Sequence, residues 1–349
     1  MNTHHANTDL PWIEKYKPRR WEDIDTRKKN IREVLFPAGK AMPNIILHGP
    51  PGTGKTTCIA CLVRSRVAWS DSCMELNASD DRGADVLRHK IQWFAQKKLS
   101  DTNPEPEPEP EPDTIQHAKR GPGPHDYKIV FVDEIDNMQA AAQQALRRLM
   151  ETYHSSTRFA FACNDITKIV EPLLSRCTAV QVMAYQDKEV GTILEDICDK
   201  EDVNYDEGGI RALILTADGD MRQAINNLQA THYSFNLVNE GNVYKICDQP
   251  HPALLRRIID GCIETPSDFV AVEHELDQLL RMGFNPQDII STLFKVVKHA
   301  TDLSAQRKME FLKEIGVCHT RLTEGVQSRL QMSGMLARMC SPLAASTIR

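Results

Sequence analysis

Long apolar runs are missing from this chain of 349 residues. A membrane-spanning helix needs about 18 or more consecutive apolar residues, and no segment approaches that length. The opening stretch MNTHHANTDLPW also lacks the basic and apolar regions of a secretory signal peptide. With 41% hydrophobic and 26% charged residues, the composition predicts a soluble globular protein that has no membrane partner.

Cysteine occurs ten times but without a metal-binding pattern. Cys58 and Cys61 form the only C-x-x-C, and no second pair stands at a zinc spacing. We expect both to be small buried thiols on a helix that packs against a sheet. Scattered, reduced cysteines are typical of the cytosol or the nucleus.

An excess of positive charge is also absent, since the formal net charge is -6. The segment 101–114, DTNPEPEPEPEPDT, holds six acidic residues and no base, so it accounts for the whole of that net charge. Proline blocks helices and ladders, and the glutamates repel one another. We therefore predict an acidic, solvated insertion over residues 99–126, and any nucleic-acid binding must come from a local basic patch.

Three short apolar runs, each followed by a turn or polar residue, are expected to be buried strands. They are NIILHG (44–49), KIVFVDE (128–134) and RFAFACN (158–164). Between the last two, apolar residues at i, i+3, i+4 and i+7 predict a helix (Leu146, Leu149, Met150 and Tyr153). Strand, helix, strand predicts an α/β fold with a parallel sheet and helices on its faces.

The chain becomes helical from about residue 186. In GDMRQAINNLQ (219–229), Asp220 is expected to be an N-cap, with Gln223 completing a capping box. After CDQPHP (247–252) the pattern stays helical to the end. There an apolar face builds a bundle core or packs on partner subunits (Leu322, Val326, Leu330, Leu336 and Met339).

The strongest motif is GPPGTGKT, residues 49–56, which fits G-x-x-x-x-G-K-[ST] and follows a predicted strand. Glycines let backbone N–H groups turn onto phosphate oxygens, and the next helix presents its positive end. Lys55 would reach the β- and γ-phosphates, and the Thr56 hydroxyl would ligate Mg²⁺. We expect ATP to bind at Gly49, Pro50, Pro51, Gly52, Thr53, Gly54, Lys55, Thr56 and Thr57.

The second motif is IVFVDE, residues 129–134, which brings two carboxylates to the carboxyl end of a strand. Asp133 would hold Mg²⁺ directly or through water, and Glu134 would polarise the attacking water. An apolar run that ends in two acids is common and mostly structural, but here it follows a phosphate loop. A kinase of small metabolites would not need Glu134.

Three further residues have two interpretations each. Asn164 is a turn former at a strand end, or it orients the water or contacts the γ-phosphate. Arg222 is a solvated side chain, or it binds an anion, because the helix dipole does not favour arginine in a first turn. Arg176, in PLLSRC (172–177), forms a local ion pair with Glu171, or its anionic partner lies on another molecule.

Together these motifs resemble an AAA+ ATPase. Four segments resemble the small subunits of replication factor C, the eukaryotic sliding-clamp loader: LPWIEKYKPRRWEDI (10–24), ELNASDDRG (75–83), QQALRRLMETY (143–153) and EPLLSRC (171–177). Later segments are similar to the subunit-2 branch of that family: GDMRQAINNLQ, VYKICDQPHP and FLKEIGVCHTRLTEGVQSRLQMSGMLARMC. The match runs from about residue 10 to 341 and is broken only by the insertion.

The resemblance implies an AAA+ α/β domain with a P-loop, a helical lid and an all-α collar. The expected boundaries are a tail at 1–10, the nucleotide-binding domain at 11–183, the lid at 184–246 and the collar at 247–349. It implies a nuclear heteropentamer with other replication factor C subunits, which uses ATP and Mg²⁺ to open the sliding clamp PCNA and load it on primer–template DNA in replication and repair.

The resemblance also implies roles for single residues. Arg176 becomes an arginine finger that acts in trans on a neighbouring subunit's ATP, and Arg222 the sensor of the subunit's own lid. Tyr16 and Pro18 lie near the adenine. The helix after NASDDRG lines the inner chamber of the ring and tracks DNA phosphates, whereas the residues alone favour an ordinary solvated face (Arg82, Arg88 and Lys90).

Some positions depart from the family pattern. DTRKKN follows EDI where a valine-glycine turn is usual, which puts base contacts at Asp25, Thr26 and Arg27 in doubt. Ile135 in VDEID and Lys17 in EKYKP are milder changes. Two rival functions stay open: a scaffold subunit that binds ATP structurally and donates Arg176, and another AAA+ DNA motor such as a branch-migration helicase. The insertion is a passive spacer, or it modulates loading electrostatically.

Overall fold

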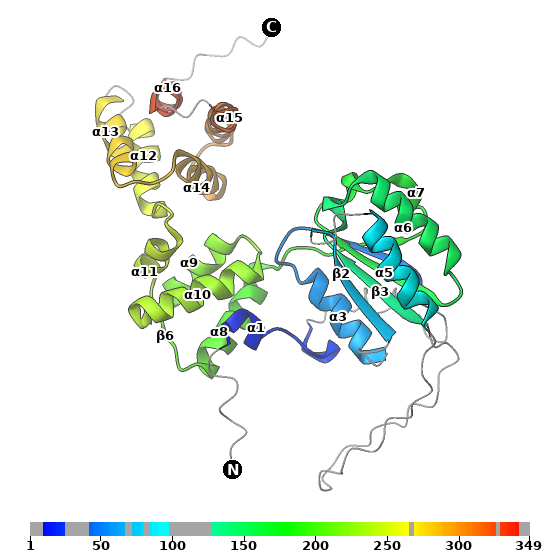
Figure 1. The fold of residues 1–349 in the computed structure, drawn as a ribbon. Helices are drawn as coiled ribbons and strands as arrows, with labels where there is room; N and C mark the ends of the chain where they lie inside the picture. Colours follow the sequence, from blue (N-terminus) through cyan, green and yellow to red (C-terminus); the bar gives the residue numbers. More distant parts are fainter. Residues whose placement is uncertain are drawn as a thin grey trace. The chain divides into compact units, whose positions relative to one another are not determined.

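The computed structural model describes residues 10–24, 42–66, 72–79, 84–97, 127–264, 269–325 and 329–341 (Figure 1). The predicted acidic insertion (99–126) lies outside these residues. So do four single residues named above: Asp25, Thr26, Arg27 and Arg82. The chain forms two compact units, Met1–Thr192 with Ala217–Asn226, and Ile193–Thr216 with Asn227–Arg349. In the described part, no helix is both long and apolar enough to cross a membrane. The four expected segments and their boundaries stay a prediction.

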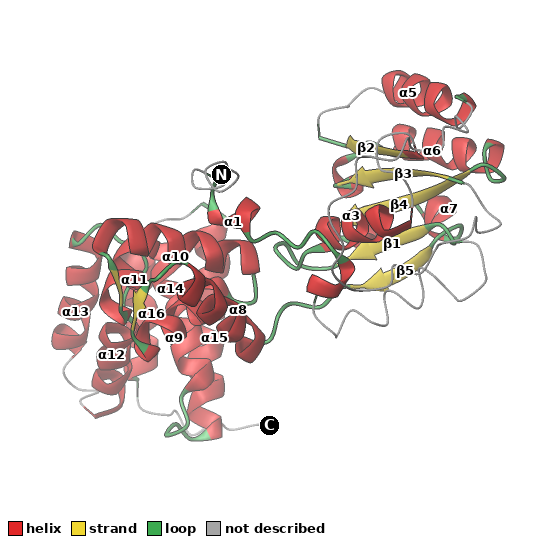
Figure 2. Cartoon of the chain, turned by 90° about the horizontal axis from the view of Figure 1, so that it is seen from below, coloured by secondary structure: helices red, strands yellow, loops and turns green. Residues whose placement is uncertain are grey.

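The first unit is built on a five-stranded parallel sheet in the order β2-β3-β4-β1-β5 (Figure 2). Its strands are β1 (Ile45–His48), β2 (Cys73–Asn77), β3 (Lys128–Asp133), β4 (Thr157–Cys163) and β5 (Thr178–Gln181). The three predicted strands are confirmed. Neither β2 nor β5 was predicted, because both lie at the edges of the sheet and carry partly exposed residues instead of a continuous apolar run.

Both faces of the sheet are buried, and alternate residues of each central strand face opposite sides. On β3, Val130 and Val132 join one core cluster, and Ile129 and Phe131 join the other. This two-sided burial explains why the central strands are continuous apolar runs. It fixes the register of the strands, and with it the positions of their carboxyl ends.

Helices cover the two faces of the sheet. Residues of α3 (Lys55–Arg66) contribute to one core cluster, and residues of α5 (Ala84–Gln96) and α6 (Ala140–Thr152) to the other (Figure 1). Cys58 and Cys61 are buried on α3, as predicted. The predicted apolar face of α6 is confirmed for Leu146, Leu149 and Met150, which are buried. The other helical segments of this unit are short: α1 (Trp12–Lys15), η1 (Trp21–Asp23), η3 (Ile135–Asn137), η4 (Ile166–Lys168) and α7 (Glu171–Leu174).

Two longer helices, α8 (Asp187–Lys200) and α10 (Met221–Phe235), contribute residues to both units. Asp220 caps α10 as predicted, because its Oδ1 accepts the Gln223 backbone N–H at 3.1 Å. The prediction of a full capping box with Gln223 was wrong. The Asp220 backbone N–H donates to the Ala217 carbonyl at 2.9 Å instead of to the Gln223 side chain.

The second unit is mainly helical. It has a two-stranded pair, β6 (Asn204–Tyr205) and β7 (Leu237–Val238), and α9 (Glu207–Ala217) and α11 (Glu240–Cys247). One core cluster joins its last five helices: α12 (Pro252–Glu264), α13 (Phe269–Arg281), α14 (Pro286–His299), α15 (Ala305–Thr323) and α16 (Arg329–Cys340). Leu322, Leu336 and Met339 belong to this core as predicted. Leu330 does not belong to this core, because it is 78% exposed at the start of α16. Val326 lies outside the described residues.

Candidate active site

The sheet order brings the predicted motifs to one edge. All five strands are parallel, so their carboxyl ends lie at the same edge of the sheet. The phosphate loop follows β1, and Asn164 follows β4, which lies between β1 and β3. Asp133 ends β3, and Glu134 comes next. Asn164 therefore stands between the phosphate loop and the two carboxylates.

The phosphate loop has the backbone that its glycines permit. Gly52 and Gly54 have φ values of 66° and 79°, in the left-handed region that favours glycine. A Cβ atom on Gly52 would lie only 1.7 Å from Asp220 Oδ1. The N-terminus of α10 thus lies against the loop, within the first unit. Lys55 and Thr56 begin α3, whose N–H groups are directed toward the loop.

Lys55 is buried, with 8% of its surface exposed. Its Nζ donates to the carbonyl oxygens of Gly49 (2.9 Å) and Pro50 (2.7 Å) and to Asn164 Oδ1 (2.8 Å). Three acceptors satisfy the three donors of an ammonium group. Burial lowers the pKa of Lys55, and the negative charge of Asp133 opposes that shift. The ammonium group is thus held at the mouth of the loop, between β1 and β4.

Thr56 and Asp133 are joined by a hydrogen bond from Thr56 Oγ1 to Asp133 Oδ2, 2.8 Å long. The pair offers a hydroxyl and a carboxylate oxygen, which are hard ligands of the kind that Mg²⁺ takes together with substrate phosphates. Among the described residues no group of three or more His, Cys, Asp or Glu side chains could hold a metal. The donor set therefore fits Mg²⁺ held jointly with phosphate, and does not fit a closed structural metal site.

Glu134 has an unusual backbone and two side-chain partners. Its φ and ψ are 53° and 40°, in the left-handed region, which is costly for a residue with a Cβ atom. The Ser79 hydroxyl and the Asn137 side-chain amide (3.1 Å) donate to Glu134 Oε2. The left-handed turn places the Glu134 carboxylate beside the end of β3, and the two hydrogen-bond donors hold it there.

Asn164 is positioned by Asp136. The backbone N–H groups of Asn164 and Asp165 lie 3.3 and 3.4 Å from Asp136 Oδ2, which accepts both hydrogen bonds. This leaves the Asn164 side chain to accept from Lys55. The structure therefore links Asn164 to the phosphate loop, as the functional interpretation of this residue requires.

Arg222 lies in the first turn of α10, as predicted, and its side chain is exposed. Its positive charge is among the influences that lower the pKa of Lys55, after burial. The contact of Gly52 with Asp220, two residues earlier, explains the proximity. Two cationic side chains thus lie near the same loop.

The N-terminal segment packs against α3, where Trp21 and Ile24 share a core cluster with Cys58 and Cys61. Cys61 Sγ donates to the Pro18 carbonyl at 3.1 Å, so Pro18 lies against this helix. Burial raises the pKa of Cys61 to about 11, so the thiol stays a neutral donor. Tyr16 is the C-cap residue of α1, and Lys15 lies over its ring. Adenine contacts by Tyr16 and Pro18 stay a prediction.

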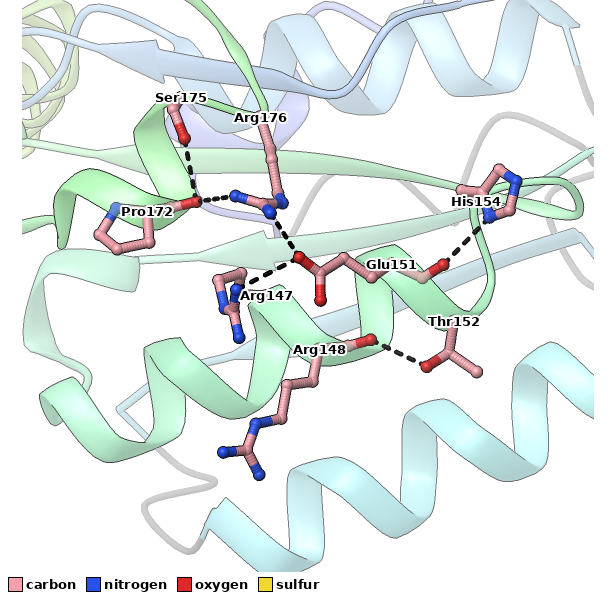
Figure 3. A network of polar contacts seen from close by, with 8 residues as sticks. All are labelled: Arg147, Arg148, Glu151, Thr152, His154, Pro172, Ser175 and Arg176. Atoms are coloured by element: carbon pink, nitrogen blue, oxygen red, sulfur yellow. Dashed lines mark hydrogen bonds and ion pairs between the residues drawn. The ribbon is translucent and has the colours of Figure 1, made fainter.

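Arg176 lies at the opposite edge of the sheet. It stands two residues before β5, and Thr178 pairs with Ile45 at the amino end of β1. The phosphate loop follows the other end of β1, and a strand of four residues spans about 13 Å. The length of the strand therefore separates Arg176 from the phosphate loop of its own subunit. Its guanidinium pairs with Glu151 of α6 and donates to the Pro172 carbonyl (2.9 Å), as Figure 3 shows. The local ion pair with Glu171 was therefore wrong, because the carboxylate that meets Arg176 comes from α6.

Arg88 and Lys90 are exposed on α5. Ile91 and Phe94 of the same helix anchor it in the core. The predicted helix after NASDDRG therefore exists and both cations on it are exposed, whereas Arg82 lies outside the described residues. Contact with DNA stays a prediction.

Three residues at the site were not predicted from the sequence: Ser79, Asp136 and Asn137. Ser79 follows β2, which was not predicted as a strand. The sequence therefore showed no sign that the carboxyl end of β2 lies next to that of β3. Asp136 and Asn137 lie in the turn after Glu134, where a sequence does not show which backbone groups are bonded. The one signal was their place in VDEIDN, next to the predicted carboxylates.

Comparison with known proteins identifies the family. Residues 45–185 match the ATPase family associated with various cellular activities (AAA), and residues 250–338 match the replication factor C C-terminal domain. The chain is 44% identical over 335 residues to the probable replication factor C subunit 2 of Dictyostelium discoideum, covering 95% of this chain and 92% of that protein. It is 43% identical to replication factor C subunit 4 of Saccharomyces cerevisiae, with 95% of each covered.

Among solved structures, the chain is similar to a single-residue variant of RuvB from Thermotoga maritima. The TM-score is 0.51 at 16% identity, with 79% of this chain and 90% of that chain covered. At that identity the likeness shows the fold alone. The relatives at more than 40% identity extend over both units, so the chain belongs to the replication factor C small-subunit family of AAA+ ATPases.

Proposed function

We propose that this chain, an ATPase subunit of the clamp-loader family, couples ATP binding and hydrolysis to opening the sliding clamp PCNA and placing it on primer–template DNA. The observation that carries the proposal is the convergence of Lys55, Thr56, Asp133, Glu134 and Asn164 at the carboxyl edge of one sheet. A structural nucleotide site would not need a carboxylate fixed at Glu134. The complete set of groups supports hydrolysis.

Each group has a separate task in phosphoryl transfer to water. Lys55 neutralises charge on the β- and γ-phosphates, and Arg222 adds a second cation from the first turn of α10. Glu134, held by Ser79 and Asn137, orients the attacking water and accepts its proton. Asn164 positions Lys55 and the water. Thr56 and Asp133 would hold Mg²⁺, which supplies charge neutralisation of the phosphate oxygens when bound.

The proposed assembly is a nuclear heteropentamer with four related subunits, in replication and repair. Arg176 supports a ring with shared sites, because it is exposed at the edge of the sheet opposite its own phosphate loop. A guanidinium there serves a neighbour's ATP more readily than its own. The helices α12 to α16 would form the collar of the ring.

The proposal predicts ATP-dependent clamp loading by the reconstituted complex. Wild-type chain, purified with its four partner subunits, is expected to transfer labelled PCNA to primer–template DNA only with ATP and Mg²⁺. The measurement is retention of PCNA on end-blocked DNA after high-salt washing. A complex with this chain's Lys55→Ala should assemble and load poorly. Equal loading by that complex would favour a scaffold, and a complex that never forms would reject the proposed assembly.

DNA contact is proposed for α5 through Arg88 and Lys90. Both are exposed on the helix that leaves the carboxyl edge of the sheet after β2. Contacts to phosphates give affinity without sequence readout, which suits a junction that can occur at any sequence.

Charge reversal of Arg88 and Lys90 to glutamate is expected to weaken DNA-stimulated ATP turnover and to flatten its salt dependence. Each lost phosphate contact lowers the slope of log affinity against log salt by about one, so two contacts lower it by about two. DNA titrations at several salt concentrations measure the slope. The matched control reverses Lys188 on α8 and Lys298 on α14, which are also exposed. An unchanged slope in the Arg88 and Lys90 variant would reject α5 as a DNA-binding element.

A further inference from the structure

Arg176 belongs to a small charged cluster on the surface of the first unit, shown in Figure 3. Glu151 lies near the end of α6, and it pairs with Arg147 one turn earlier on the same helix (3.2 Å) and with Arg176 across from it. Arg176 comes from the turn after α7, 25 residues further along the chain. The cluster therefore joins two elements that meet at the amino edge of the sheet.

Two contacts fix the Arg176 guanidinium from both ends. Nη1 donates to the Pro172 carbonyl at 2.9 Å, and Nη2 donates to Glu151 Oε1. A guanidinium has five N–H donors in a rigid plane, so three donors stay available for an anion. The side chain remains 37% exposed. The group is held in place and open to solvent at the same time.

The cluster keeps its positive charge despite the carboxylate. Glu151 lies between two arginines, so the three side chains together carry a net charge of +1. Cys177, next in sequence, contributes no charge, because burial raises the pKa of its thiol to about 12. An incoming phosphate would therefore meet a cationic surface.

We propose that Glu151 is a positioning residue that fixes the orientation of Arg176 toward the phosphates of a neighbouring subunit's ATP. The inference rests on the proposed role of Arg176 in trans. A long arginine side chain that is ordered before it meets its target loses less freedom when it binds. The Glu151 carboxylate and the Pro172 carbonyl supply that order, and Arg147 holds Glu151.

The test uses the assembled complex in which this chain also carries Glu134→Gln, so that the remaining turnover comes from the other subunits. The part of that turnover which disappears with Arg176→Ala is the Arg176-dependent turnover. We expect Glu151→Ala to lower the kcat of this part by up to about a hundredfold, the loss that misplacing a catalytic group by about 1 Å can cause. The KM for ATP should change little, because the substrate contacts of the neighbouring site are intact.

Four further variants separate positioning from a merely structural role. Glu151→Asp, which keeps the charge, should restore part of the loss, and Glu151→Gln tests the same side-chain size without it. With Arg176→Ala present, Glu151→Ala should cause no additional loss. Glu171→Ala, the same change on the exposed acid that precedes Arg176 on α7, should leave turnover unchanged.

The outcomes are distinct. Unchanged Arg176-dependent turnover in Glu151→Ala would overturn the positioning role, and increased turnover would show that Glu151 restrains the arginine instead. If Arg176→Ala itself leaves turnover unchanged, the role in trans fails and Glu151 has nothing to position. Gel filtration of each complex confirms assembly, and Glu151→Gln serves as the conservative variant if Glu151→Ala assembles poorly.

Discussion

Glutamine in place of Glu134 is expected to leave ATP binding intact and to lower hydrolysis at this subunit's own site by about 10²- to 10⁴-fold. The amide has the size of the carboxylate but cannot accept the proton of the attacking water. Lys55 and its three acceptors are untouched, so the phosphates keep their main cation. Nucleotide titration and single-turnover hydrolysis, both on the assembled complex, measure the two effects separately.

The control for this prediction is Asn137→Ala. Asn137 donates one of the two side-chain hydrogen bonds to Glu134 Oε2, and Ser79 keeps the other. Its removal should slow hydrolysis far less than Glu134→Gln does, because the base itself remains. If Glu134→Gln hydrolyses ATP and loads clamps as the wild type does, the chain is a scaffold that binds ATP structurally, and the catalytic assignment fails.

The positions of the main site residues were predictable because these residues stand at the ends of central strands. β1, β3 and β4 are apolar runs that end in polar residues, and in a parallel sheet all such ends share one edge. Lys55, Asp133 and Asn164 could therefore be expected together from the amino-acid sequence. The phosphate-loop motif GPPGTGKT also predicted the turn after β1 and the start of the helix that follows it.

What escaped prediction depends on edge strands and tertiary contacts. β2 (Cys73–Asn77) has a partly exposed, mixed pattern, so the adjacency of Ser79 to Glu134 was invisible. The sequence offered Arg176 either Glu171 or an anion on another molecule, and the structure adds Glu151 of α6, which neither alternative named. A sequence gives local neighbours directly, but it gives pairs separated by 25 residues only through the fold.

Alanine in place of Arg176 is expected to act on a neighbour and not on this subunit. Hydrolysis at the neighbouring site should fall by about 10³- to 10⁵-fold, the range in which arginine fingers contribute to GTP hydrolysis. ATP affinity at this chain's own Lys55 should stay the same. The measurement pairs a nucleotide titration of this subunit with turnover of a complex whose own site is silenced by Glu134→Gln.

Arg222→Ala gives the opposite pattern and is the matched control. Arg222 lies in the first turn of α10, whose cap residue Asp220 meets the phosphate loop, so its loss should slow this subunit's own turnover. The two arginines then report on two different ATP molecules. Weaker ATP binding at Lys55 in the Arg176→Ala variant would place the finger in cis and contradict the prediction.

The direction of this prediction follows from the sheet itself. Lys55 and Arg222 lie at the carboxyl edge, whereas Arg176 precedes β5 at the amino edge, about 13 Å away along a four-residue strand. An arginine side chain, anchored there by Pro172 and Glu151, cannot also reach the phosphate loop of its own sheet. Its exposed donors are therefore open to an anion that arrives from outside the subunit, and in the proposed ring we expect that anion to be the nucleotide of the next subunit.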